Sequence, residues 1–465
     1  MNPAPVPLRG PVNIIGAGPT GALLAILLQR RGLPVTLYES RSDPRGTPGE
    51  SGRSINLALA DRGIHALKLA GVYDDIAPTL RAMRGRRVHQ RDGSESLHMY
   101  GQRPSEVIYS VSRHRLNQAL LDVAAAAQVS IRFEHRLEDM DFRSGTARLR
   151  DERNARMVTI PMLPLLAADG AGSTARRRMA AAGLIRNREA ELDHGYKEIS
   201  IPKGPDGEYR LAPDALHIWP RGNFMLIALP NADGSFTATL FLAKHGAPSF
   251  DTLNSDAAID SFLTAEFPDV RALMPDCVAE FQRHRTGFLG TVYAEGWNAA
   301  GMAALIGDAA HAIVPFHGQG MNCCFEDCLE FMTCLENNGS WEAVFADFFA
   351  ARKRNTDAIA DMALENYLEM RERVADPAFR LQQTLALELE RRHPERFIPR
   401  YSMVMFHHEI PYRVAQERGA IQSRLLSELT KRAKTLADVD YQRAAEDVSR
   451  DLPPISAAHV PESQS

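Results

Sequence analysis

Apolar residues near the start of the chain follow a pattern of strand, turn, helix and second strand. Residues 11–15 and 34–38 suit short strands, and residues 22–28 are apolar without strand alternation. A continuous apolar helix of this kind is typical of one buried against a parallel sheet. Gly32 predicts its end. The stretch therefore predicts a β-α-β unit.

Two later apolar strands each deliver an aspartate at the carboxyl end. Residues 165–168 precede Asp169 and Gly170, and residues 303–306 precede Gly307 and Asp308. A glycine-rich turn, Gly318-Gln319-Gly320, then predicts a helix running toward Leu335. Each Asp–Gly or Gly–Asp pair alone is explained as well by an ordinary turn. The order of three such strand ends favours one shared site.

The intervening segments have a different pattern. Residues 85–89 and 95–100 predict a hairpin around Asp92-Gly93, and residues 196–242 predict short antiparallel strands. Residues 51–59 suit a polar loop, followed by a helix at 63–69. A helix at 116–127, a strand at 131–133 and a short helix at 261–267 are also predicted. From 347 on the chain predicts helices at 347–370, 382–392 and 420–436, with residues 400–404 as an interruption after Pro399.

Composition narrows the class of protein. The chain has 465 residues, 45% hydrophobic and 24% charged, so it suits a globular protein of more than one domain. Its 54 basic and 58 acidic residues give a formal net charge of −4 at pH 7. This near-neutral balance argues against nucleic acid or an anionic membrane as a partner. No secretory signal or apolar run of about 18 residues is visible, so we expect a cytoplasmic protein.

The five cysteines, an odd number, suit reduced thiols. Four of them gather at positions 323, 324, 328 and 334, where a metal site or a redox pair is one interpretation. The absence of a CxxC pair favours their interpretation as small buried hydrophobes, and no metal is predicted.

The first turn carries a dinucleotide-binding pattern, Gly16-Ala17-Gly18-Pro19-Thr20-Gly21. Gly16 allows the tight turn, Gly18 lets a pyrophosphate approach, and Gly21 lets helix and strand pack closely. Glu39 lies 23 positions after Gly16, where an acid binds ribose hydroxyls and repels a 2′-phosphate. FAD or NAD is therefore favoured over NADP, and a glycine turn without ligand is the weaker alternative.

The later signals fit a flavin. Asp308 is placed to hold polyol hydroxyls, and the helix after Gly320 would direct its N-terminus at the flavin N1 and C2 carbonyl.

Several longer strings make the chain resemble the FAD-dependent aromatic hydroxylases related to p-hydroxybenzoate hydroxylase, and within them the kynurenine 3-monooxygenases. The resemblance covers nearly the whole chain and is carried by residues 52–59, 83–89, 217–220, 314–322, 362–367 and 397–403. Ser51 stands where that family often has arginine. The C-terminal hydrophobic anchor of the animal members is absent, which leads us to expect a soluble enzyme.

The resemblance implies a fold and a division of the chain. We expect an α/β protein with a discontinuous Rossmann-like FAD-binding domain (1–72, 101–182 and 298–346), an interleaved, mainly antiparallel β-sheet substrate domain (73–100 and 183–297), a C-terminal helical region (347–452) and a disordered tail (453–465).

FAD contacts are predicted from the motifs and from the resemblance. The motifs contribute Gly16, Gly18, Thr20, Gly21, Asp169 and Gly320. The resemblance implies Glu39, Arg41, Ala58, Arg113, Leu137, Asp308, Met321 and Asn322.

Substrate contacts are implied by the resemblance alone. Arg86 and Tyr100 would hold an amino-acid carboxylate, with Asn366 and Tyr401 completing that end. The ring pocket would be lined by Ile227, Leu229, Phe241, Pro315, Phe316, His317, Glu369 and Met370. Phe316, His317 and Gly318 would lie near the reacting ring, and no side chain is expected to act as a catalytic acid or base. From the pattern alone, Arg86 suits a surface arginine and His317 a loop histidine.

The resemblance also implies the reaction. NADPH would reduce FAD, and O₂ would form a C4a-hydroperoxyflavin that hydroxylates L-kynurenine at the ring 3-position, giving 3-hydroxykynurenine in tryptophan degradation. No second Rossmann fingerprint is visible for NADPH, so transient docking is expected. Alternatives are a hydroxylase of a phenolic acid or substituted kynurenine, a plain FAD dehydrogenase or reductase, and a flavin-free binding protein. A monomer or homodimer is expected.

Overall fold

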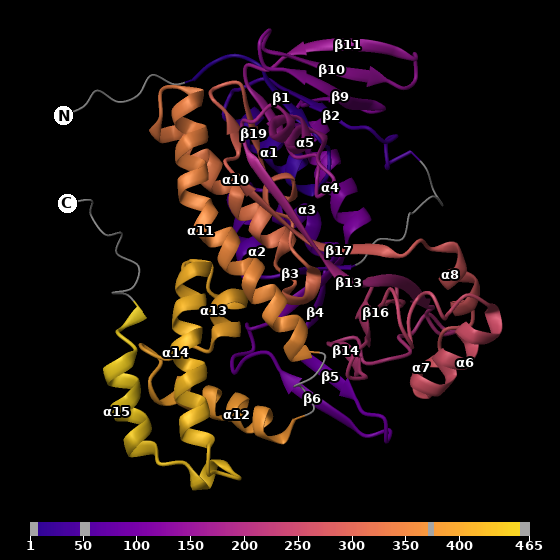
Figure 1. Ribbon diagram of the computed structural model, residues 1–465, viewed down its shortest axis with the longest axis vertical. Coiled ribbons are helices and arrows are strands. Elements are labelled where there is room, and N and C mark those ends of the chain that lie inside the picture. Colours follow the sequence, from indigo (N-terminus) through magenta and orange to yellow (C-terminus); the bar gives the residue numbers. More distant parts are fainter. Residues whose placement is uncertain (1–7, 47–55, 371–375, 456–465) are drawn as a thin grey trace. The chain divides into compact units, whose positions relative to one another are not determined.

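The computed structural model describes residues 8–46, 56–370 and 376–455. The chain forms two compact units, each assembled from three separate stretches (Figure 1). Unit 1 comprises residues 1–80, 110–192 and 288–360, and unit 2 comprises residues 81–109, 193–287 and 361–465.

A six-stranded, mostly parallel sheet forms the centre of unit 1, in the order β18-β19-β12-β1-β2-β8. The strands are β1 (Val12–Ile15), β2 (Val35–Tyr38), β8 (Ser130–Arg132), β12 (Leu165–Ala167), β18 (Asn298–Ala299) and β19 (Ala303–Leu305). Ile14 in the central β1 lies opposite Leu37 and Leu166, and all of β1 is buried. Because β1, β2, β12 and β19 are parallel, their carboxyl ends share one edge of the sheet.

Helices cover this sheet, because its apolar strands must be buried from water. Helix α1 (Pro19–Arg30) buries most of its residues and contacts α4 (Arg113–Ala126) and α10 (Gly320–Asn337). The predicted β-α-β unit is confirmed. The other elements of unit 1 are α2 (Asp61–Leu69), α3 (Tyr73–Ile76), η1 (Ala77–Thr79), α5 (Thr174–Ala181), α9 (Asp308–His311), η2 (Pro315–His317), β3 (Asn56–Leu59) and β7 (Ile108–Ser112), whose first residues belong to unit 2.

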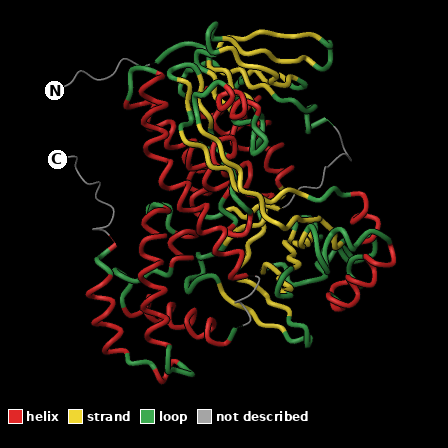
Figure 2. Tube along the Cα trace, viewed as in Figure 1, coloured by secondary structure: helices red, strands yellow, loops and turns green. Residues whose placement is uncertain are grey.

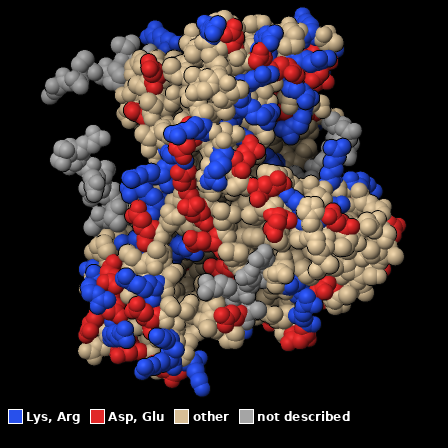
Figure 3. Space-filling model, viewed as in Figure 1, with Lys and Arg blue, Asp and Glu red and all other residues tan. Residues whose placement is uncertain are grey.

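A three-stranded antiparallel sheet in unit 1 was not predicted. It consists of β9 (His135–Asp141), β10 (Thr146–Asp151) and β11 (Arg156–Pro161). Ala147 and Leu149 point inward, while arginine and acidic side chains alternate with them on the outside, where Figure 3 shows both charges interleaved. The alternation of β10 was the available signal.

Unit 2 is built on a sheet in the order β17-β13-β16-β15-β14-β5-β6. Its strands are β5 (Gly85–His89), β6 (Glu95–Met99), β13 (Arg186–Ile201), β14 (Ala215–Pro220), β15 (Met225–Pro230), β16 (Phe236–Ala243) and β17 (Gly287–Glu295), with a short β4 (Arg81–Met83) preceding them. Strands β13 and β17 begin or end in unit 1. The predicted β5–β6 hairpin and the antiparallel strands of 196–242 are confirmed.

One face of this sheet forms a hydrophobic core. Trp219, Leu226 and Leu240 belong to this core, which continues into α6 (Asp256–Glu266), α7 (Pro268–Arg271) and α8 (Cys277–Arg283). Residues on the same strands that alternate with the core residues point to the other face.

The C-terminal part of unit 2 is helical (Figure 2). After α11 (Trp341–Leu368), which starts in unit 1, come α12 (Pro377–Arg392), α13 (Arg400–Phe406), α14 (Tyr412–Thr430), η4 (Leu436–Asp438) and α15 (Tyr441–Asp451), with a core of their own. The predicted interruption at 400–404 is wrong, because Pro399 caps a helix there. The predicted loop at 51–59 is also wrong for residues 56–59, which form β3; residues 51–55 lie outside the described ranges.

The predicted α/β class, with a Rossmann-like domain, an antiparallel sheet and C-terminal helices, is confirmed. The predicted disordered tail lies, from 456 on, outside the described residues. Among the described residues, no helix is long and apolar enough to cross a membrane.

Candidate active site

The first glycine turn is packed tightly on one side and open on the other. A Cβ on Gly16, whose φ is +100°, would lie 2.3 Å from the carbonyl oxygen of Ala168, and one on Gly21 would lie 1.9 Å from the Gly16 oxygen. A Cβ on Gly18 would meet nothing within 4 Å. Because α1 begins directly after Gly18, its unpaired N–H groups point toward this open space.

Glu39 directly follows β2 and supports the same turn. Its carboxylate is buried and accepts bonds from the Ala17 N–H at 2.9 Å and from the Arg41 Nε at 2.8 Å. Burial alone would raise the pKa of Glu39, but the bonds from Arg41 and Ala17 outweigh burial and lower it. Glu39 is therefore ionised at neutral pH, at the place predicted for a ribose-binding acid.

The two aspartates at strand ends differ in how they are used. Asp169 accepts bonds from the Ser173 hydroxyl at 2.5 Å and from the Thr174 N–H at 2.7 Å, so it caps α5. Burial raises the pKa of Asp169, against these bonds. Asp308, half-buried, has one contact among the described residues, from the Cys324 thiol at 3.5 Å. The Asp308 carboxylate therefore keeps its capacity for hydroxyl groups.

Asn322 lies in the first turn of α10 and is fully buried. Its amide nitrogen donates to Ala58 at 2.8 Å and to Gly318 at 2.9 Å, and its oxygen accepts from the Ala60 N–H at 2.9 Å. Its side chain therefore holds β3 against the turn before α10. Its backbone, with those of Gly320 and Met321, forms the helix N-terminus predicted to face a flavin.

The remaining predicted FAD residues lie at other positions of unit 1. Thr20 is in the first turn of α1, and its methyl would be 3.0 Å from a Cβ on Gly307. Arg113 is exposed at the start of α4, and Leu137 is buried in β9, where it lines a surface pocket beside α5. Within the described residues, Arg113 and Leu137 form no hydrogen bond or ion pair with the glycine turn.

These features of unit 1 fit FAD. Gly18 leaves room for a pyrophosphate at a helix N-terminus, Asp308 offers a carboxylate to the polyol, and α10 offers a second helix N-terminus.

Unit 2 contains a half-buried cation beside two stacked aromatic rings. The Arg86 guanidinium carbon lies 4.7 Å from the centre of the Tyr401 ring and 5.7 Å from that of Tyr100, and the two rings stack at 5.8 Å. Burial opposes the charge on Arg86, but Tyr401, Tyr100 and Glu369 together raise its pKa. Among the residues that the structure describes, the buried Arg86 Nε has no hydrogen-bond partner. A half-buried arginine with spare donors suits a carboxylate.

Apolar residues share a sheet face with this cation. Arg86 pairs with Leu216, and Ile218 on the same strand pairs with Ile227, so Arg86 and Ile227 point to one face. Leu229 and Phe241 lie on this face too, because Phe241 pairs with Met225, two residues before Ile227. It is the face opposite the α6–α8 core.

Residues 9–338 match the model of the FAD binding domain family. Kynurenine 3-monooxygenase from Stenotrophomonas maltophilia is 48% identical over 448 residues, 96% of this chain and 98% of that protein. The enzyme of the same name from Xanthomonas axonopodis pv. citri is 46% identical over 456 residues, 98% of this chain and 100% of that protein.

The chain belongs to the kynurenine 3-monooxygenase family.

Solved structures support the fold of this kynurenine 3-monooxygenase family member. The chain matches 2-methyl-3-hydroxypyridine-5-carboxylic acid oxygenase with a TM-score of 0.64 and 19% identity, over 80% of this chain and 95% of that one. It matches Pseudomonas aeruginosa PqsL, solved with 2-aminobenzoylacetate, with a TM-score of 0.62 and 21% identity, over 79% and 98%. The predicted resemblance to flavin hydroxylases is confirmed.

The other predicted substrate residues lie near the end of α11 and in η2. Asn366 donates to the Met370 sulfur at 3.3 Å near the end of α11, where Glu369 also lies, so these three belong to unit 2 with Arg86. Pro315, Phe316 and His317 form η2 of unit 1, and Gly318 follows in the left-handed conformation.

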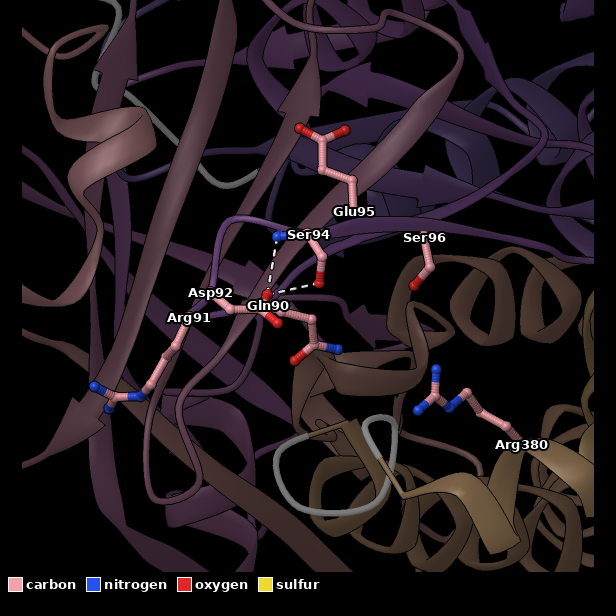
Figure 4. A pocket seen from close by; sticks show the side chains of 7 residues that line it. All are labelled: Gln90, Arg91, Asp92, Ser94, Glu95, Ser96 and Arg380. Carbon is pink, nitrogen blue, oxygen red and sulfur yellow. Dashed lines mark hydrogen bonds between the residues drawn. The ribbon is translucent and has the colours of Figure 1, made fainter.

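A second feature of unit 2 contrasts with the Arg86 group. A pocket of about 540 Å³ beside the β5–β6 hairpin is lined by Gln90, Arg91, Asp92, Ser94, Glu95, Ser96 and Arg380 (Figure 4). Asp92 accepts bonds from Ser94, and Arg91 pairs with Glu266 at 2.6 Å. Its polar lining does not suit an aromatic ring, unlike the face that carries Ile227.

The sequence did not reveal a buried charge network on α10. Glu326 and Asp327 bind Arg62, Arg352 and His311 in the interior of unit 1. The available signal was a pair of acids within the otherwise apolar run from Cys323 to Cys328, since buried acids require partners.

Proposed function

We propose that this protein is an NADPH- and FAD-dependent monooxygenase that hydroxylates L-kynurenine at the ring 3-position. The observation that carries this proposal is the half-buried Arg86 cation, with its Nε buried, on the same sheet face as Ile227, Leu229 and Phe241. A cation for the carboxylate and an apolar surface for the aryl ring match an aromatic amino acid. The relatives of nearly full length bear the corresponding name.

Arg86 fixes the amino-acid end of the substrate. Its planar guanidinium donates parallel N–H bonds to the carboxylate. Burial raises the pKa of Tyr100 and of Tyr401, so both hydroxyls stay protonated and donate to the same anion. The carboxylate of Glu369, near enough to Arg86 to affect its pKa, balances the substrate ammonium.

Residues of unit 1 hold the cofactor. When bound, FAD supplies electron transfer from NADPH and the activation of O₂. The turn at Gly18 admits the pyrophosphate, Asp308 holds the polyol, and the N-terminus of α10 stabilises negative charge on the ring. The apolar face of unit 2 orients the aryl ring and excludes water from it.

The decisive experiment is product identification after incubation of the purified protein with L-kynurenine, NADPH and air. We expect a yellow protein, substrate-dependent oxidation of NADPH, consumption of O₂ and formation of 3-hydroxykynurenine. A panel of phenolic acids and ring-substituted kynurenines tests the alternative substrates. Product from a panel member but none from L-kynurenine overturns the proposed substrate. A colourless protein that takes up no FAD overturns the enzymatic proposal.

An Arg86→Met variant tests the carboxylate contact directly. Loss of about two charge-assisted bonds, roughly 3–5 kcal/mol, lowers kcat/KM for L-kynurenine at least about 150-fold. Kynuramine, which lacks the carboxylate, serves as the matched substrate, and we expect the variant and the wild type to use it equally poorly. Equal kinetics with L-kynurenine would remove Arg86 from the site. We further propose a cytoplasmic monomer or homodimer, to be tested by fractionation and light scattering.

A further inference from the structure

A buried carboxylate in unit 1 contacts both ends of the short helix that begins at Asp308. Asp327 is fully buried, and its Oδ2 accepts bonds from the Gly307 N–H at 3.2 Å and from the His311 Nε2 at 2.5 Å. Its Oδ1 accepts a bond from the Arg352 Nε at 2.7 Å. Because Gly307 precedes α9 and His311 ends it, one carboxylate clamps the whole helix.

The clamp is one end of a larger ion network. The Arg352 Nη1 lies 2.6 Å from the Glu326 Oε2, and the Glu326 Oε1 lies 2.7 Å from the Nη1 of Arg62, which is fully buried. Two acids and two arginines balance in charge. Such buried networks are costly unless fully bonded and add little net stability. Net stability therefore does not explain why the network is there, which points to a role in positioning nearby groups.

The clamped turn needs support because its backbone is unusual. Gly307 has φ +64° and ψ −139°, a conformation that favours glycine, and a Cβ there would lie 3.0 Å from the Thr20 methyl and 3.1 Å from the Cys324 sulfur. Asp308 itself has only the weak Cys324 thiol contact among the described residues. Its own bonds therefore do not fix its carboxylate.

A metal site is a weaker interpretation of the same residues. His311, Cys323 and Asp327 offer three ligand atoms within 4.8 Å of one another. The Arg352 guanidinium, however, donates to Asp327 and lies 3.4 Å from the Cys323 sulfur, so a cation already occupies this position. Burial raises the pKa of the Cys323 thiol, which disfavours a thiolate ligand.

We propose that Asp327 is a positioning residue for FAD, which clamps α9 at Gly307 and His311 and so holds the Asp308 carboxylate where the polyol hydroxyls bind. This inference rests on the proposed FAD site. Arg352 keeps the Asp327 carboxylate ionised and correctly turned, and Arg62, at the far end of the network, contributes to folding alone.

FAD titration of the apoprotein tests this assignment. Asp327→Asn leaves one acceptor oxygen for three donors, so Kd for FAD should rise at least about tenfold, as for loss of one charge-assisted bond. Arg62→Met is the matched control, because Arg62 pairs with Glu326 at the end of the network away from Asp327. Both variants should lower the unfolding temperature of the apoprotein, but Arg62→Met should leave Kd within about threefold of wild type. Equal weakening in both variants, or none in Asp327→Asn, overturns the proposal.

A second variant covers the case that Asp327→Asn does not fold. Asp327→Leu combined with Arg352→Met removes both charges, and Glu326 keeps Arg62 as its partner. We expect a folded apoprotein with the same loss of FAD affinity. Unchanged affinity, or failure of both variants to fold, would assign a purely structural role to Asp327. Wild-type protein is titrated first, so that absence of FAD binding there counts against the proposed function and not against Asp327.

Discussion

Gly18→Ala separates ligand binding from folding more cleanly than other substitutions in the first turn. Gly18 has φ −68° and ψ 176°, which alanine adopts readily, and a Cβ there meets no protein atom within 4 Å. At Gly16, by contrast, φ is +100° and a Cβ would lie 2.3 Å from the Ala168 oxygen. Gly16→Ala therefore damages the fold itself, whereas Gly18→Ala affects only what approaches the open side.

The expected magnitudes follow from this geometry. Alanine is a poorer helix N-cap than glycine, but it also restricts the unfolded chain by about 0.4–1 kcal/mol, so the apoprotein should keep nearly its wild-type stability. In the complex the new methyl meets the pyrophosphate. Overpacking of this kind costs about 1–3 kcal/mol, which corresponds to a rise in the Kd for FAD of roughly 5- to 150-fold.

The assay combines thermal unfolding of the apoprotein with titration by FAD, followed through flavin fluorescence. Gly46→Ala is the matched control, because Gly46 also has open space around its Cβ position and an ordinary φ. We expect wild-type affinity for Gly46→Ala and weakened affinity for Gly18→Ala at equal apoprotein stability. If Gly18→Ala binds FAD as tightly as wild type, no pyrophosphate lies against Gly18 and the interpretation of this turn is wrong.

Three further predictions concern single side chains. Asp308→Asn should leave apoprotein stability within about 0.5 kcal/mol, since the Asp308 carboxylate accepts one weak thiol bond among the described residues, but it should raise the Kd for FAD about tenfold; thermal unfolding and FAD titration check the two effects. Tyr401→Phe keeps the ring on Arg86 but loses the hydroxyl, so KM for L-kynurenine should rise at least about tenfold in steady-state kinetics, and an unchanged KM would count against it. The pKa of Glu39 is lowered in the folded protein, so its ionised form contributes stability above its unfolded pKa, and this contribution is lost as pH falls through the folded value. Glu39→Gln should therefore be less stable than wild type at neutral pH, and the difference should shrink as pH falls below the ordinary glutamate pKa; a difference independent of pH refutes this.

The strand ends were predictable because parallel strands bring their carboxyl ends to one edge. What each aspartate does there was not. Asp169 and Asp308 follow two neighbouring parallel strands, β12 and β19. Asp169, however, accepts hydrogen bonds from Ser173 and Thr174 at the start of α5. The sequence contained a hint, since Ser173-Thr174 is a typical helix start. The predicted contact of Asp169 with FAD stays a prediction.

Contacts between distant segments could not be predicted. Asn322 bonds to Ala58 and Ala60, more than 250 positions earlier, and no local pattern contains this information. The resemblance placed Asn322 at the flavin, and the structure adds that its side chain is fully used in holding β3. The Asp327 clamp is hidden for the same reason, because its partners Gly307 and Arg352 lie on separate segments.

Gly85, which has no side chain, determines where the neighbouring Arg86 lies. Arg86 and Arg87 are neighbours on β5 and so point to opposite faces: Arg86 lies with Tyr100, while Arg87 pairs with Glu95 at 3.2 Å. A slip of one residue would exchange them. Gly85 lies opposite Met99, and a Cβ at 85 would come within 2.4 Å of the His98 oxygen. Any other residue of β5 in this place would push the strands apart, so the close approach at Gly85 fixes the register and, through it, which arginine lies beside the two tyrosines.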